Sequence, residues 1–259
     1  AESVGYFKAS NSDASDFFGR RIALSADGRT LAVGANHESS NATGIGQNEN
    51  NNDLSDSGAV YVFTLGADGW VQQAYIKASN AGVGDQFGLG LGLSADGDTL
   101  AVGAWLEDSS AIMIDGPQDN NARKDSGAVY VFTRSGTEWS QQAYLKAPNN
   151  DSDDKFGWNV ALSADGDTLA IGAHGEDSSA TVINGDSQDD SAESAGAVHV
   201  FYRIGVVWTY QAYIKADNAH TGDLFGFSVA LSADGETLAV GAHGENDTAH
   251  NSGAVYMFS

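Results

Sequence analysis

The stretch Val160-Ala161-Leu162-Ser163-Ala164-Asp165-Gly166-Asp167-Thr168-Leu169-Ala170-Ile171-Gly172-Ala173 decides the fold of this chain. Its two apolar runs flank an Asp-Gly turn, which is the strongest short-range signal for a β-hairpin. The apolar residues have a period of two, as in a strand, and not the period of a helix. The same stretch occurs four times at intervals of 69 residues, with the turn aspartates at Asp27, Asp96, Asp165 and Asp234. The chain is therefore an internal repeat.

Each unit continues with two further strands after the hairpin. A long polar segment leads into residues 127–132, a short turn follows, and residues 139–147 complete the unit. We name these four predicted strands a to d. Four antiparallel meanders predict an all-β fold, a four-bladed β-propeller with four strands per blade. The whole chain, 1–259, forms one domain, with repeats at 10–78, 79–147, 148–216 and 217–259 plus 1–9.

The N-terminal residues are out of phase with the repeat. Residues 5–9 match residues 74–78, the end of strand d, while the sequence stops after strand c at 253–258. We therefore expect residues 3–9 to pair with residues 253–258 and to close the ring. The alternative is a four-unit part of a longer ring. The last b–c loop is shorter than the others, which favours a terminal unit.

Composition narrows the class of partner. The net charge is −23 and the chain has no cysteine. The charge argues against nucleic acid and anionic membranes as partners, and for solubility or divalent cations. No apolar run is long enough to span a membrane, so we expect no membrane insertion. We expect the chain to be a mature form or an excised domain.

A family resemblance rests on Phe87-Gly88 followed by Val102-Gly103-Ala104, and on Phe225-Gly226 followed by Val240-Gly241-Ala242. This pattern resembles the FG-GAP repeat of integrin α-subunit propellers and of secreted bacterial proteins, and it covers nearly the whole chain. The resemblance implies a secreted, extracellular adhesion or recognition module, often with calcium in an Asp-rich a–b turn. Here that turn has Leu162 and Thr168 near its ends and too few oxygen ligands. We therefore expect its aspartates to form the turn and to hold no metal.

Strand polarity collects the long acidic loops on one rim of the propeller. Two acidic positions recur there, one before strand a and one after strand b: Asp16, Glu38, Asp85, Glu107, Asp154, Glu176, Asp223 and Glu245. The two carboxylates of one blade should lie close together. They are candidate calcium ligands, and calcium is the possible cofactor. Alternatively, each aspartate accepts backbone N–H groups and caps its loop.

Departures from the repeat are the better guide to a ligand site. Trp105, His174 and His243 follow strand b at equivalent positions and are the candidate ligand-binding residues. A metal role for the histidines is disfavoured because no second histidine lies at ligand spacing. Residues 112–114 and 181–183 are apolar within polar loops; they either fold back as a local strand or present an apolar contact to a partner.

Two further positions repeat on strand d. Trp70, Trp139 and Trp208 are expected to anchor the packing between blades, and Lys8, Lys77, Lys146 and Lys215 to form a solvated outer edge.

These observations favour a binding module for carbohydrate or a protein surface, through the long-loop face, with calcium as a possible aid. A carboxylate pair repeated four times suits a scaffold better than an active site, so no enzyme is expected. The alternatives are a polysaccharide hydrolase or lyase that uses the acidic rim, and a structural module of a larger surface protein. No phosphate loop, nucleophile elbow or zinc-protease motif occurs.

Overall fold

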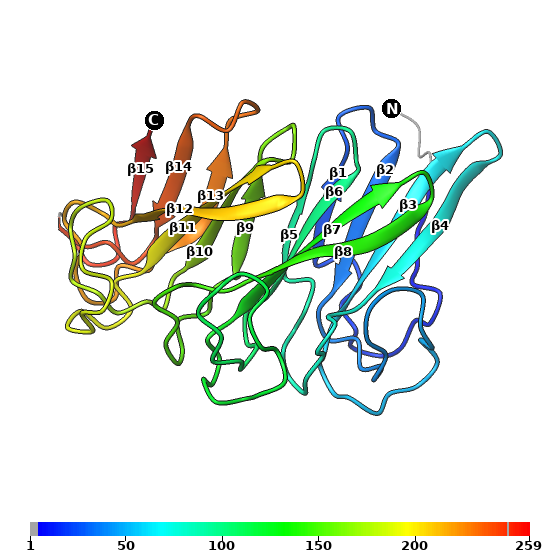
Figure 1. Ribbon diagram of the computed structural model, residues 1–259, viewed down its shortest axis with the longest axis horizontal. Helices are drawn as coiled ribbons and strands as arrows, with labels where there is room; N and C mark the ends of the chain where they lie inside the picture. Colours follow the sequence, from blue (N-terminus) through cyan, green and yellow to red (C-terminus); the bar gives the residue numbers. More distant parts are fainter. Residues whose placement is uncertain (1–4, 248) are drawn as a thin grey trace.

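The computed structural model describes residues 5–247 and 249–259. Fifteen strands form four antiparallel sheets, each a meander in chain order, and no described residue is helical. Figure 1 shows the sheets side by side, with the long loops on one side and the short hairpin turns on the other. The predicted all-β fold of four antiparallel blades is confirmed.

In each sheet the strands lie side by side in chain order, with the first strand innermost and the last strand outermost. The first blade contains β1 (Arg21–Leu24), β2 (Thr30–Ala35), β3 (Ala59–Gly66) and β4 (Gly69–Ile76). The second contains β5 (Gly90–Leu93), β6 (Thr99–Ala104), β7 (Ala128–Ser135) and β8 (Glu138–Leu145). The third contains β9 (Asn159–Leu162), β10 (Thr168–Ala173), β11 (Ala197–Ile204) and β12 (Val207–Ile214). The fourth contains only β13 (Phe225–Leu231), β14 (Leu238–Ala242) and β15 (Ala254–Phe258).

The predicted a–b turns form as expected. In the third blade the Ser163 hydroxyl donates to Asp165 Oδ1 at 2.6 Å, and the same oxygen accepts the Asp167 N–H at 3.0 Å. The carboxylate thus closes an Asx turn, the role predicted for it. Neighbouring turns also join the blades, since the N–H of Ala95 donates to the carbonyl of Ala164 at 2.8 Å.

Two of the three tryptophans of strand d, Trp139 and Trp208, anchor adjacent blades as predicted. Trp139 Nε1 donates to Gln73 Oε1 at 2.9 Å, and Trp208 Nε1 donates to Gln142 Oε1 at 2.9 Å. Each bond therefore joins the outer strand of one blade to that of the blade before it. Trp70 packs against Phe7, with ring centroids 5.4 Å apart.

The predicted closure of the ring is not observed among the described residues. Residues 5–9 form no strand and lie against the first blade, where Phe7 contacts Phe63 at 5.2 Å between centroids. In the described part of the chain β15 pairs only with β14, so the fourth blade has three strands and not the predicted four. Residues 3 and 4 of the predicted closing segment lie outside the described residues.

The apolar loop segments 112–114 and 181–183 do not form a local strand, which was one of the two alternatives predicted for them. They turn, and the residue that follows reaches back to strand d: the Tyr144 N–H donates to Asp115 Oδ1 and the Asp115 N–H donates to the Tyr144 carbonyl. Met113 and Val182 remain 59% and 61% exposed. Two hydrogen bonds at one residue hold the loop to the blade without extending the sheet.

Candidate functional site

Three of the four glutamates after strand b meet a lysine at the end of strand d of the same blade. The ion pairs are Glu38–Lys77, Glu107–Lys146 and Glu176–Lys215, with Nζ–Oε2 distances of 2.7, 2.8 and 2.8 Å. The lysine side chains are 0% exposed. A buried charge without a partner costs several kcal/mol, so each residue requires the other. The prediction that these three lysines form a solvated outer edge is therefore wrong; only Lys8 is exposed.

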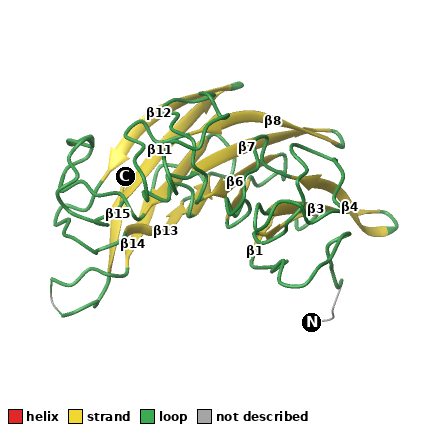
Figure 2. Cartoon of the chain, turned by 90° about the horizontal axis from the view of Figure 1, so that it is seen from below, coloured by secondary structure: helices red, strands yellow, loops and turns green. Residues whose placement is uncertain are grey.

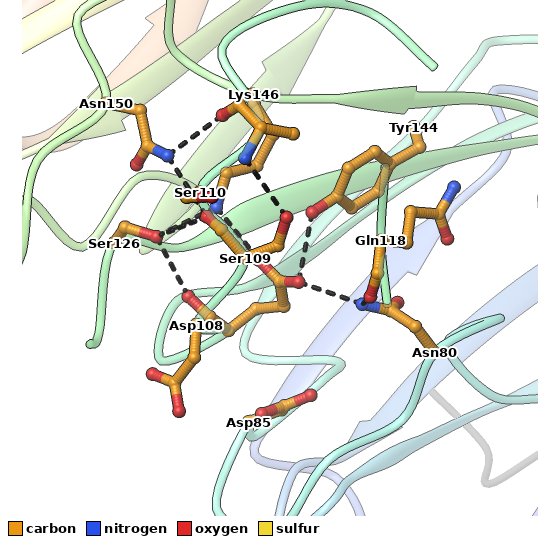
Figure 3. Close-up of polar contacts among 12 residues, drawn as sticks. Asn80, Asp85, Asp108, Ser109, Ser110, Gln118, Ser126, Tyr144, Lys146 and Asn150 are labelled. Carbon is orange, nitrogen blue, oxygen red and sulfur yellow. Dashed lines mark hydrogen bonds and ion pairs between the residues drawn. The ribbon is translucent and has the colours of Figure 1, made fainter. Parts of the chain in front are cut away.

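Neutral donors complete each of these centres. In the second blade Glu107 accepts the Tyr144 hydroxyl at 3.0 Å and the Asn80 amide at 2.8 Å, while Lys146 also donates to the Ser126 hydroxyl at 2.8 Å. Figure 3 shows Lys146, Tyr144 and Asn80 converging from three directions, with Asp85 to one side. Burial lowers the pKa of Lys146, and the Glu107 carboxylate opposes that shift. The centre thus joins the ends of strands b and d to Asn80 in the loop before strand a and to Ser126 in the b–c loop.

The aspartate before strand a caps the d–a loop. In each blade its Oδ2 accepts a backbone N–H from three residues earlier, at 2.7–2.8 Å; the aspartates are Asp16, Asp85, Asp154 and Asp223. Burial raises the pKa of all four, to about 7 for Asp85 and about 8 for Asp154, and the glutamate of the same blade adds to the shift. Asp and Glu therefore do lie near each other.

This geometry fits the loop-capping interpretation of the aspartates. Among the described residues, no group of three or more His, Asp or Glu side chains could hold a metal ion. Three of the four glutamates are already neutralised by lysine. Calcium at the eight carboxylates stays a prediction.

The three candidate ligand-binding residues fall into one aromatic cluster. Trp105 contacts Trp158 with ring centroids 4.8 Å apart, and Trp158 contacts His174 at 4.9 Å and Phe227 at 5.1 Å. Phe227 contacts His243 at 4.2 Å. These rings come from the second, third and fourth blades, where the two inner strands meet the long-loop rim. We call these five residues the aromatic cluster.

Polar atoms around the aromatic cluster have no partner in the described structure. Buried Trp158 Nε1, His174 Nδ1 and Asn36 Oδ1 make no hydrogen bond. Burial lowers the pKa of His174 to about 4, so its imidazole is neutral at pH 7. Trp105 Nε1 donates to Gln86 Oε1 at 3.2 Å, which in turn accepts the Asn36 amide at 3.0 Å. Buried polar groups without partners are uncommon and call for a specific explanation, such as a bound ligand or water.

Sequence reasoning missed two members of the cluster, Trp158 and Phe227. Both come directly after a Phe-Gly pair, where the other two repeats have Arg20 and Leu89. The signal was present, because this position departs from the repeat in the same way as the position of Trp105. The same search for departures, applied before strand a, would have found them.

The chain belongs to the FG-GAP repeat family, whose repeat matches residues 3–63, 70–132, 139–201 and 208–258. It is thus an FG-GAP β-propeller repeat module. None of the curated proteins matches it. No helix in the described residues is long and apolar enough to cross a membrane.

Solved structures resemble the chain in fold alone. The β-propeller domain of Cps50 (Swd1) from Myceliophteria thermophila is 12% identical, with a TM-score of 0.45, over 85% of this chain and 46% of that one. A protein from Lactobacillus plantarum is 14% identical, with a TM-score of 0.46, over 85% and 49%. A putative 6-phosphogluconolactonase from Bacteroides uniformis is 13% identical, with a TM-score of 0.47, over 93% and 67%. The chain spans about half the length of the first two.

Proposed function

We propose that this protein is an extracellular binding module that recognises carbohydrate through the aromatic cluster. The observation that carries the proposal is the row of five rings across three blades, beside buried polar atoms that have no partner. Binding sites for small ligands combine apolar and aromatic walls with a few placed polar groups. A sugar ring offers an apolar face for the indoles and hydroxyl groups for the unpaired nitrogen and oxygen atoms.

Electrostatics narrow the class of sugar. The chain has a net charge of −23, which repels polyanions. His174 is neutral at pH 7 and adds no positive charge to the cluster. We therefore expect neutral glycans to bind better than sulfated or uronic ones.

The contacts of the acidic residues on the rim suit a scaffold for a binding module better than they suit a catalytic site. A general acid or base must be free to exchange a proton with substrate. The glutamates of the first three blades are instead buried in ion pairs with lysine, and the aspartates accept backbone N–H groups. These contacts support a scaffold role for the rim.

A protein surface is the second candidate ligand. Ile112, Met113, Val182 and Ile183 are 51–61% exposed on the b–c loops of the second and third blades. Exposed apolar groups that recur on one face are typical of protein contacts. Such a partner would bind the b–c loops and not the aromatic cluster.

The test combines a glycan array, with and without calcium, and titration calorimetry on the best neutral glycan. Trp105→Ala and Trp158→Ala should each weaken binding by about tenfold or more, as expected for central aromatic contacts. The matched control is Tyr202→Ala, which removes an exposed ring from β11, away from the cluster. Equal affinities of all four proteins, or no neutral glycan bound, would overturn the carbohydrate proposal.

A further inference from the structure

Each junction between consecutive blades is formed by two unlike surfaces. The first and fourth blades each have one such surface that no other blade covers in the described structure. Consecutive blades are joined by a parallel bridge between the glycine before strand c and the phenylalanine of the next Phe-Gly pair: Gly58 with Phe87, Gly127 with Phe156 and Gly196 with Phe225. By the repeat, the fourth bridge would join Gly253 to Phe18. The described residues make no such bridge.

The fourth blade shows the first half of this junction. Val129 and Val131 on β7 are 0% exposed, because the third blade covers them. Their equivalents on β15, Val255 and Met257, are 71% and 64% exposed. Beside them is a hollow of about 440 Å³ lined by Phe227, Gly241, His243, Gly253 and Val255, among others.

A Phe-Gly pair of another blade fits this hollow. At the equivalent inner glycine, Gly103, an added Cβ would lie 2.0 Å from the Gly157 carbonyl oxygen, so backbone fills that space. At Gly241 the added Cβ would meet only atoms of Ser228. The space beside Gly241 is therefore open where the inner junctions hold a glycine backbone.

The first blade shows the second half. Ile22 and Leu24 on β1 are 66% and 57% exposed. Their equivalents in the second blade, Leu91 and Leu93, pack against the core that joins the first two blades. An added Cβ on Gly19 would contact nothing, although at Gly88 it would lie 2.8 Å from the Ala59 carbonyl oxygen.

The charges of the two halves also match. Glu245 is 5% exposed and, among the described residues, pairs with no lysine. Lys8 lies 69 positions before Lys77 and is exposed. By the repeat these two residues are the partners of a fourth glutamate–lysine pair. Tyr6, which precedes Lys8 as Tyr144 precedes Lys146, is 87% exposed.

Residues 5–9 already occupy the place of a strand d that belongs to a preceding blade. Asn11 donates to Glu38 Oε1 at 2.9 Å, as Asn80 donates to Glu107 at 2.8 Å. Phe7 packs on Trp70, as Ile76 shares a core with Trp139. Figure 2 shows the four sheets as an arc, with β15 toward one end and β3 and β4 of the first blade toward the other. The free strand and the free sheet edge of one molecule are thus on opposite ends.

We propose that two copies of this chain assemble head to tail, with β15 of each molecule beside residues 5–9 of the other. Each Glu245 then meets a Lys8, and each hollow receives a Phe18-Gly19 pair. One junction of two unlike surfaces either closes into a ring or continues as a filament. In a dimer, the two outward surfaces of each molecule are both covered by the other molecule, so the assembly is closed.

Light scattering during size exclusion tests the proposal on the 259-residue chain. Its mass should be twice 26.9 kDa. Lys8→Glu and Glu245→Lys should each weaken association by about 30-fold or more, since like charges would then meet in a buried junction. An equimolar mixture of the two variants should recover the dimer, because one junction regains opposite charges and the other keeps the native pair.

Circular dichroism should show both variants folded. If either is not, Gly241→Ala replaces it, since its methyl group would enter the hollow and weaken association, while its one close contact within one molecule is the rotatable Ser228 hydroxyl. A wild-type chain that stays monomeric at all concentrations overturns the proposal. If Lys8→Glu and Glu245→Lys each lower the stability of that monomer, and the variant with both changes in one chain regains it, the ring closes within a single molecule. A mass that grows with concentration means an open filament and overturns it as well.

Discussion

The inner blade junctions and the two outward faces are made from the same sequence positions but differ in burial. Val129 in an inner junction is fully buried, while Val255, its equivalent on β15, is 71% exposed. Lys146 is buried against Glu107, while Lys8 is exposed. A repeat of this kind cannot bury its own faces, so its stability depends on the neighbouring unit. The burial of a position in the repeat therefore depends on whether a neighbouring blade covers it.

The largest expected difference between the two regions concerns the buried ion pair. Lys146→Met leaves Glu107 buried without a counter-charge and should lower the free energy of unfolding by about 3–5 kcal/mol. Lys8→Met, which removes an exposed lysine, should leave the stability of the single molecule nearly unchanged. Urea denaturation at low protein concentration measures both. Equal losses would show that Glu107 does not depend on Lys146.

The double variant Glu107→Gln with Lys146→Met serves as the control for this prediction. It removes both charges, so part of the lost stability should return. If the double variant is no more stable than Lys146→Met alone, lost packing and not the unpaired carboxylate explains the effect.

The second contrast uses two glycines at equivalent positions. Gly103→Ala places a methyl group against the Gly157 carbonyl oxygen of the next blade and should cost about 1–3 kcal/mol through strain in a packed junction. At Gly241→Ala the one close contact of the added Cβ is the Ser228 hydroxyl, which can rotate away, so the cost should be below about 0.5 kcal/mol. Thermal and urea unfolding of both variants, at a protein concentration low enough to keep the chain monomeric, provide the comparison. A larger loss at Gly241 under these conditions would mean that the outward face is covered within one molecule.

Local sequence signals predicted much of this structure because they describe local physics. The Asp-Gly turn at 165–166 and the apolar alternation of 168–173 gave the hairpin, and the structure has β10 at Thr168–Ala173. Lys146 could not be placed from its neighbours, since its burial depends on Glu107, 39 positions earlier. Trp105, His174 and His243 were predicted as ligand-binding candidates from departures in the repeat. Their contact through Trp158 could not be predicted locally, because it depends on how adjacent blades meet.

The third prediction concerns the pH dependence of stability that arises from Asp154, one of the aspartates that cap the d–a loops. The pKa of Asp154 is about 8 in the folded state and 3.8 is its ordinary value. Between these values the folded state keeps a proton that the unfolded state has lost, so stability falls as pH rises through that window. Asp154→Asn keeps an acceptor but cannot titrate, so the curve of unfolding free energy against pH should be flatter, by at most about 1.4 kcal/mol per pH unit.

Asp165→Asn is the matched control for the pH experiment. The Ser163 hydroxyl lowers the pKa of Asp165, which contributes stability that is lost only as pH falls below about 4. Its substitution should leave the curve between pH 5 and 8 unchanged. A slope in that range that Asp154→Asn does not alter would assign the proton to another group.

Calcium should give the smallest effect. Lysine already neutralises the glutamates of the first three blades. In the single molecule, at low protein concentration, a cation therefore gains most at the fourth blade, where Glu245 has no lysine in the described structure and buried Asp223 Oδ1 has no hydrogen-bond partner. Millimolar calcium should raise Tm by at most about 2–4 °C, which corresponds to ~1 kcal/mol for a chain of this size. Sodium chloride of equal ionic strength should raise it less, because screening does not distinguish cations. Glu245→Gln should remove the difference between calcium and sodium. If chelation leaves the melting curve unchanged and calorimetry detects no calcium, the acidic residues serve only as loop caps and partners of lysine.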